Sequence, residues 1–141
     1  MQTEKIIDKA ASFFKMAQET TGGRRALDLI RWKQTIPFMV DNQSLFYLDV
    51  QRGSIKVNPG EAPKLDPEKE FYDVSRVYTD LETLNKIFEG KKDSLEAQWE
   101  DETLTLLPTG NYAQITLLHQ LFKFGRNEIL AEKIRKFEES E

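Results

Sequence analysis

The stretch "SLFYLDVQRGSIKVN", Ser44–Asn58, carries the pattern that decides the fold. Apolar side chains alternate along its first half, so that Phe46, Leu48 and Val50 point to one side of an extended strand. The residues "QRGS" supply a turn, and the alternation resumes at Ile55. Two alternating runs joined by a short turn that contains glycine predict a β-hairpin.

Three further segments around this hairpin have strand character. The first is "TIPFMV", 35–40, where Pro37 suits an edge or an end because it donates no backbone hydrogen bond. The second is "EFYDVSRVY", 70–78, and the third is "TLTLLP", which places Leu104 and Leu106 on one side. We therefore expect five strands, in a block over 34–78 and a last strand over 103–107.

Helical periodicity surrounds these strands. In residues 1–33 an apolar face repeats at helical spacing, and Gly22-Gly23 is expected to end the first helix before a short second one. Two short helices over 79–100 have candidate N-caps, Thr79 or Asp80 for the first and Asp93 or Ser94 for the second. The members of the first apolar face are Ile6, Ala10, Phe13, Phe14 and Ala17.

The C-terminal helices, 111–137, open with the apolar stretch "TGNYAQITLLHQLFKFGR", 109–126. Its apolar residues cover much of the helix circumference, so the helix is either sandwiched between two layers or meets something other than protein on one face. Gly110 and Gly125 are expected to bound it, with a separate charged helix over 128–137. Strands in one block flanked by helices predict a single α+β domain over 1–141.

Composition narrows the classes of partner. The chain has 39% hydrophobic and 31% charged residues and a net charge of −4, without a basic half, which argues against nucleic-acid binding. It has no cysteine and no apolar run of about 18 residues, so we expect a cytoplasmic protein with at most transient membrane contact. The basic clusters for such contact are Arg24, Arg25, Arg31 and Lys33, then Lys91 and Lys92, then Lys133, Arg135 and Lys136.

Catalytic motifs are absent from the sequence. There is no GxSxG, HExxH, P-loop or GxGxxG pattern, and the single histidine, His119, lies inside the apolar helix. The carboxylates of Glu100–Glu102 are adjacent in a turn and do not converge on one ion. We therefore predict no catalysis, no metal site and no cofactor.

The order and spacing of these segments resemble one known family, the sterol carrier protein-2 (SCP2) domain. The resemblance rests on "FYLDVQRGSIKVNPG", on the strand at 71–78 followed by "TDLETLNKIFEGKKDSLEAQW", and on "LTLLPTGNYAQITLLHQLF". It covers about 35–124. The family usually has a glycine before the last strand, where this chain has Trp99–Glu102. This chain also ends in "ESE" and lacks the peroxisomal tripeptide of some members.

The resemblance implies a five-stranded, mostly antiparallel sheet covered on one side by helices, with a hydrophobic tunnel between the layers. Such a tunnel takes a sterol, a fatty acyl chain or a similar lipid, for carriage or presentation without catalysis. The residues predicted to form its wall are Phe46, Leu48, Leu84, Phe88, Trp99, Leu104, Leu106, Ile115, Leu118 and Phe122.

Two other functions remain open at this point. The same apolar helix could bury itself in a homodimer or in another protein, because exposed apolar patches commonly mark such contacts. Alternatively, the domain serves an enzyme that acts on an apolar metabolite, with His119 or a carboxylate acting on the bound substrate.

Overall fold

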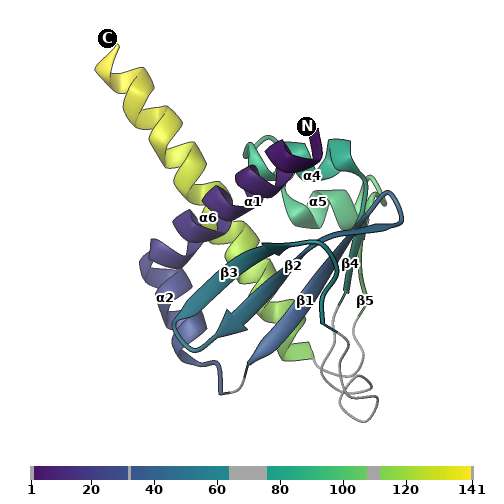
Figure 1. Ribbon diagram of the computed structural model, residues 1–141. Helices are drawn as coiled ribbons and strands as arrows, with labels where there is room; N and C mark the ends of the chain where they lie inside the picture. Colours follow the sequence, from purple (N-terminus) through teal and green to yellow (C-terminus); the bar gives the residue numbers. More distant parts are fainter. Residues whose placement is uncertain (1, 32, 64–75, 108–111, 141) are drawn as a thin grey trace.

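The computed structural model describes residues 2–31, 33–63, 76–107 and 112–140. Its elements are α1 (Gln2–Glu19), α2 (Thr21–Asp28), β1 (Gln34–Val40), β2 (Gln43–Gln51), β3 (Ser54–Pro59), β4 (Arg76–Thr79), α4 (Leu81–Phe88), α5 (Ser94–Trp99), β5 (Leu104–Leu107) and α6 (Tyr112–Glu139). Figure 1 shows the strands side by side in one sheet, with the helices gathered behind it. The α+β prediction is confirmed.

The sheet has the strand order β3-β2-β1-β4-β5. The pairs β1–β2, β2–β3 and β4–β5 are antiparallel, whereas β1–β4 is parallel. The predicted hairpin is confirmed, with Val50 opposite Ile55 across its strands. The predicted strand at 71–78 is present from Arg76 onward, and its first part lies outside the described residues.

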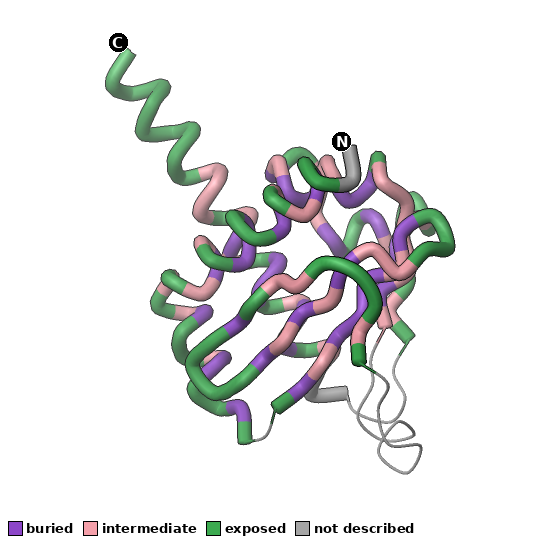
Figure 2. Tube along the Cα trace, in the orientation of Figure 1, coloured by how far each residue is buried: buried purple, intermediate pink, exposed green. Residues whose placement is uncertain are grey.

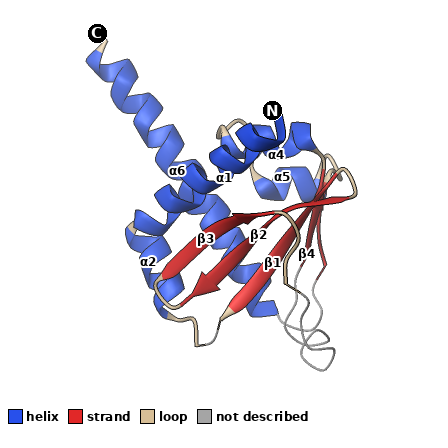
Figure 3. Ribbon diagram, viewed as in Figure 1, coloured by secondary structure: helices blue, strands red, loops and turns tan. Residues whose placement is uncertain are grey.

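The two faces of the sheet differ in burial, as the alternation predicts. Phe46, Leu48 and Val50 on β2 are buried, whereas Tyr47 and Asp49 between them are only half-buried. Figure 2 shows this alternation as changing burial colours along the strands, and Figure 3 shows the described helices on one side of the sheet. The apolar face therefore points to the helices, and the hydrophobic core lies between the two layers.

Helix α1 is the element that closes this interior over the hairpin. All five residues of its predicted apolar face are buried, which confirms that prediction. At its C-terminal end the Gln18 Oε1 atom accepts the backbone N–H of Ile55 at 3.0 Å. Because β3 is an edge strand, this hydrogen bond satisfies a donor that has no neighbouring strand.

The prediction that Gly22 and Gly23 end the first helix is wrong. Helix α1 ends at Glu19, and both glycines lie inside α2, where the Thr20 Oγ1 atom caps the Gly23 N–H at 2.9 Å. A Cβ on Gly22 would lie 2.3 Å from the ring of Phe124. Gly22 is therefore needed because α2 and α6 approach each other closely.

Gly125 likewise does not end a helix. Helix α6 runs without a break from Tyr112 to Glu139, so the two predicted C-terminal helices are one. A Cβ on Gly125 would lie 2.4 Å from the Phe13 Cζ atom. The glycine thus forms a notch that lets the Phe13 ring of α1 lie against the α6 backbone.

Candidate functional site

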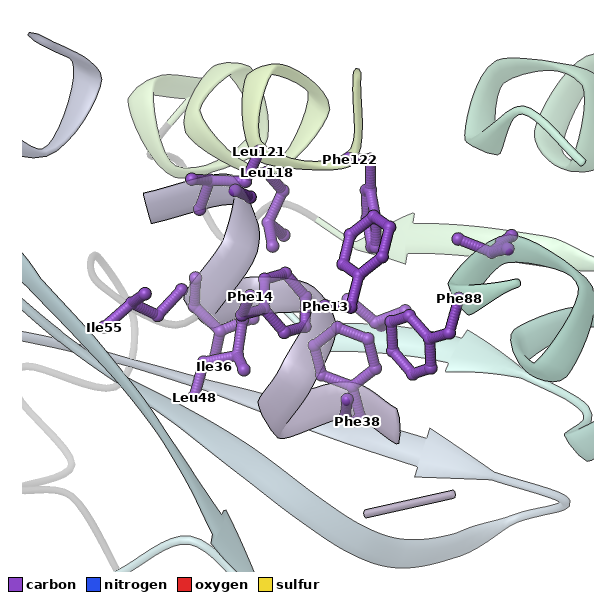
Figure 4. Packing of buried hydrophobic residues seen from close by; sticks show 14 of the residues in the cluster. Phe13, Phe14, Ile36, Phe38, Leu48, Ile55, Phe88, Leu118, Leu121 and Phe122 are labelled. Atoms are coloured by element: carbon purple, nitrogen blue, oxygen red, sulfur yellow. The ribbon is translucent and has the colours of Figure 1, made fainter. Parts of the chain in front are cut away.

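Aromatic rings fill the centre of the layer between the sheet and α6. Phe14 has the Phe88 and Phe122 ring centroids 5.8 Å away and that of Phe13 at 5.4 Å. Phe38 stacks on its cross-strand partner Phe46 with centroids 4.6 Å apart. Figure 4 shows Phe13 and Phe14 between the strands and α6. Among the described residues, the buried polar side chains are Gln34, Thr83 and Ser94, none of which is ionisable.

The structure brings most of the predicted wall residues to this interior. Leu106 packs against the buried hydrophobic cluster, whereas Ile115 is half-buried outside it. The wall residues that belong to the buried cluster itself are Phe46, Leu48, Leu84, Phe88, Leu104, Leu118 and Phe122.

Trp99 does not join the other predicted wall residues, since its side chain is 80% exposed. It is the last residue of α5, a helix of six residues whose buried side carries Ser94 and Ala97. Two positions along a helix is a rotation of about 200°, so Trp99 faces away from the side that Ala97 buries. It contributes instead to a shallow surface pocket beside Leu95.

Two residues central to the interior, Phe13 and Phe14, are absent from the predicted wall. Their helical spacing correctly indicates that they are buried, but it does not reveal what they contact. In the structure they lie where the predicted tunnel would run, between Phe38 on β1 and Phe122 on α6. The signal in the sequence that could have placed them in the wall is the pair of adjacent phenylalanines on the buried side of an amphipathic helix.

A pocket of about 350 Å³ reaches this aromatic cluster from the surface. It lies where α1, α4 and α6 meet, and both Phe13 and Phe88 contribute to it. Its apolar lining also includes Met16 and Ile129. The polar residues of its lining are Asp8, Lys9, Ser12 and Glu89.

An ion-pair network holds one side of the pocket rim. The Lys9 Nζ atom lies 2.7 Å from the Glu89 Oε1 atom and donates to the Asn85 Oδ1 atom at 3.1 Å. Lys91 contacts the other carboxylate oxygen of Glu89 at 3.0 Å. The hydrogen bonds from Lys9 and Lys91 lower the pKa of Glu89 to about 2, so this carboxylate is ionised at neutral pH.

His119 is half-buried on α6, and its Nδ1 atom has no hydrogen-bond partner within the described residues. Burial lowers its pKa, and Asp93 only partly opposes this effect. The imidazole is therefore mostly neutral at pH 7. Across residues 2–31, 33–63, 76–107 and 112–140, no three side chains of the metal-binding types cluster into a metal site.

Comparison with known proteins yields matches in structure only. No family model and no curated protein sequence matches the chain. Sterol carrier protein 2 is similar in its crystal structure, with a TM-score of 0.53, 21% identity, and coverage of 84% of this chain and 94% of that chain. The chain has the SCP2 fold.

Two other solved structures share the SCP2 fold with this chain. UbiJ-SCP2, a ubiquinone synthesis protein, has a TM-score of 0.58 at 13% identity over 86% of this chain and 96% of that chain. A candidate sterol carrier protein from Thermus thermophilus has a TM-score of 0.50 at 19% identity, covering 85% of each chain. At these identities the likeness establishes the fold, which confirms the resemblance at that level.

Within the described helices, none combines the length and the apolar character needed to cross a bilayer.

Proposed function

We propose that this SCP2-fold domain binds a lipid or another hydrophobic small molecule between the sheet and α6, without catalysis. The observation that carries the proposal is the pocket of about 350 Å³ whose apolar lining includes Phe13 and Phe88. Small-molecule sites are concave, mostly apolar and about 300–1,000 Å³ in volume. Because both rings belong to the interior cluster, a guest in this pocket already touches the cluster.

A long guest reaches the interior when the rings of Phe13 and Phe14 give way to it. Exposing two phenylalanine rings costs about 3–6 kcal/mol, whereas each buried methylene gains about 0.8 kcal/mol. Displacing both rings therefore requires about four to eight buried methylenes, and a twelve-carbon chain gains about 10 kcal/mol before ordering costs. The wall in that state is Phe46, Leu48, Leu84, Phe88, Leu104, Leu106, Ile115, Leu118 and Phe122.

The rim suits a guest with a polar head. Lys9 has a side chain that is 41% exposed, beside the ionised carboxylate of Glu89. An anionic headgroup can therefore replace Glu89 as the ion-pair partner of the Lys9 ammonium group. The carboxylate of Glu89 keeps its ion pair with Lys91 when this happens. The apolar lining of the pocket makes no directional contacts, so its selectivity among hydrocarbon chains of different lipids would be low.

Native mass spectrometry of freshly purified protein tests the proposal, together with titration of a fluorescent long-chain fatty acid. We expect a retained lipid or saturable uptake. Met16→Trp fills the pocket and should weaken uptake at least about tenfold, the loss of one well-placed contact. Leu29→Trp places the same ring at a residue that is 79% exposed and should leave uptake unchanged. If the wild type neither retains lipid nor takes up the fatty acid, the proposal is refuted.

Dimerisation through the apolar stretch of α6 receives no support from the geometry. Leu117, Leu118, Leu121 and Phe122 are buried inside the chain, so a partner could not reach them without opening the fold. This helix is apolar over a wide arc because it contacts α1 and α2 as well as α4 and α5.

A further inference from the structure

The C-terminal part of α6 projects away from the rest of the molecule. Every residue from Ala131 to Ser140 is exposed, and Figure 2 shows this part of the tube without any chain beside it. Two large apolar side chains lie on it, Ile134 at 57% and Phe137 at 65% exposure. An isolated helix of this length is marginal in water, so a partner along this segment would stabilise it.

These apolar side chains form a stripe on the outward side of α6. Leu130, Ile134 and Phe137 are spaced by four and three residues, which places them on one helix face. At about 100° per residue, this face is opposite to that of Leu121 and Gly125, which are buried against the domain. The apolar side of α6 thus changes from inward to outward along the helix.

The domain leaves the outward side of α6 open further toward its N-terminal end. Gln120, Lys123 and Asn127 continue the line of the stripe, and all three are exposed. The line of the stripe is therefore accessible to solvent along this part of α6 as well. Figure 1 shows the yellow end of α6 pointing away from the sheet.

We propose that the stripe of Leu130, Ile134 and Phe137 binds the same stripe of a second copy of this chain in a parallel, in-register coiled coil. The spacing puts Asn127 and Ile134 at a positions and Leu130 and Phe137 at d positions. Parallel dimers favour a β-branched residue at a with leucine at d, and an asparagine at a selects this arrangement and its register.

Flanking charges complement each other in this arrangement. Lys133 occupies a g position and Glu138 the e position five residues later, so Lys133 of each copy faces Glu138 of the other. Neither residue has an ion-pair partner within the described part of the chain. Arg135, in contrast, already pairs with Glu132 at 2.6 Å and Glu128 at 3.4 Å on its own helix.

The same charges disfavour an anionic membrane as the occupant. Residues 128–139 contain Glu128, Glu132, Glu138 and Glu139 against Lys133, Arg135 and Lys136, four negative against three positive charges. Segments that bind anionic lipid surfaces carry an excess of lysine and arginine. Since two heptads make a small interface, the dimer is weak and depends on protein concentration.

Sedimentation of the full chain over a range of concentrations tests the proposal. The mass should rise from 16.4 kDa toward twice that value as the concentration increases. Ile134→Glu should remain monomeric at every concentration, and Lys136→Gln, on another side of the helix, should behave as wild type. Lys133→Glu should weaken association about tenfold or more, and adding Glu138→Lys should restore it.

Cysteine cross-linking tests the orientation, because the chain contains no cysteine. In a parallel coil Asn127→Cys and Ile134→Cys should each form a disulfide-linked dimer, and Lys136→Cys should not. In an antiparallel coil centred on Ile134 the two copies of position 127 lie about 20 Å apart and cannot be bridged.

A wild type that stays monomeric overturns the proposal, including one that binds vesicles of anionic phospholipid. A dimer that survives Ile134→Glu, or one that cross-links only through Ile134→Cys, overturns it as well. Far-UV circular dichroism of each variant confirms that the domain remains folded.

Discussion

Replacing Phe14 with alanine tests whether α1 truly fills the layer between the sheet and α6. Phe14 is 1% exposed and has aromatic neighbours on three other elements, Phe38 on β1, Phe88 on α4 and Phe122 on α6. A buried phenylalanine truncated to alanine loses its transfer free energy and leaves a cavity, at a cost of about 3–5 kcal/mol. Phe14→Ala should therefore remove a large part of the free energy of unfolding, which is about 5–15 kcal/mol for a domain.

The expected change is large enough to measure in two ways. With an unfolding entropy of about 2.1 cal/mol/K per residue, a loss of this size lowers the Tm of the chain by about 10–17 °C. Urea unfolding should show a lower midpoint with an unchanged m-value, because the surface exposed on unfolding is nearly the same. Trp99→Ala removes an aromatic ring at an 80% exposed site and should alter the free energy by less than about 0.5 kcal/mol.

Ligand binding gives the same variant a second readout. If Phe14 occupies space that a guest needs, Phe14→Ala removes part of the cost of entry, so a long-chain fatty acid should bind more tightly and raise the Tm more than in the wild type. A decrease of less than about 1 kcal/mol in the free energy of unfolding would refute the reasoning that Phe14 is tightly packed in the interior. Weaker fatty-acid binding in a folded variant would contradict the proposed site.

Three further perturbations have defined outcomes. Gly125→Ala should lower the free energy of unfolding by about 1–3 kcal/mol in thermal unfolding, although alanine favours helices, because its Cβ would lie 2.4 Å from the ring of Phe13. Asp80→Ala should cost about 1 kcal/mol in urea unfolding, since the carboxylate caps α4, and Asp80→Asn should retain most of that stability. Glu89→Gln should lower the Tm slightly at pH 7 but not near pH 2, because the depressed pKa of Glu89 stabilises the fold above about pH 4.5 and this contribution is lost as the pH falls toward 2. If the difference in Tm between wild type and Glu89→Gln stays constant from pH 7 to pH 2, the ion pair of Glu89 with Lys9 is not the cause of that difference.

Local periodicity predicted the strands and the buried side of α1. The alternation of Phe46, Leu48 and Val50 fixes which face of β2 is buried, because successive strand residues point to opposite sides. Asp80 is likewise confirmed as the cap of α4. Its carboxylate accepts the backbone N–H of Thr83, which is only three residues further along the chain. Both depend on neighbours in the sequence, and a sequence displays such neighbours directly.

Glycines and remote contacts explain what the sequence could not predict. In a sequence, a glycine that ends a helix cannot be distinguished from one that makes room for an aromatic ring of a distant element. Gly125 requires knowledge of Phe13, and Gly22 requires knowledge of Phe124. Trp99 was placed among the wall residues because α5 has too few turns for periodicity to define its buried side. The pocket lining from α1 and α6 depends on tertiary contacts in the same way.

The contact of α1 with α6 joins the two ends of the sequence through the rings of Phe13 and Phe122. During synthesis the apolar side of α1 emerges well before its partner on α6. The domain therefore cannot complete its interior before α6 has been synthesised, and contacts between distant positions slow the search for the native state. The apolar side of α1 stays exposed until α6 packs on it, and truncations within Leu117–Phe122 should yield aggregates rather than a smaller stable domain.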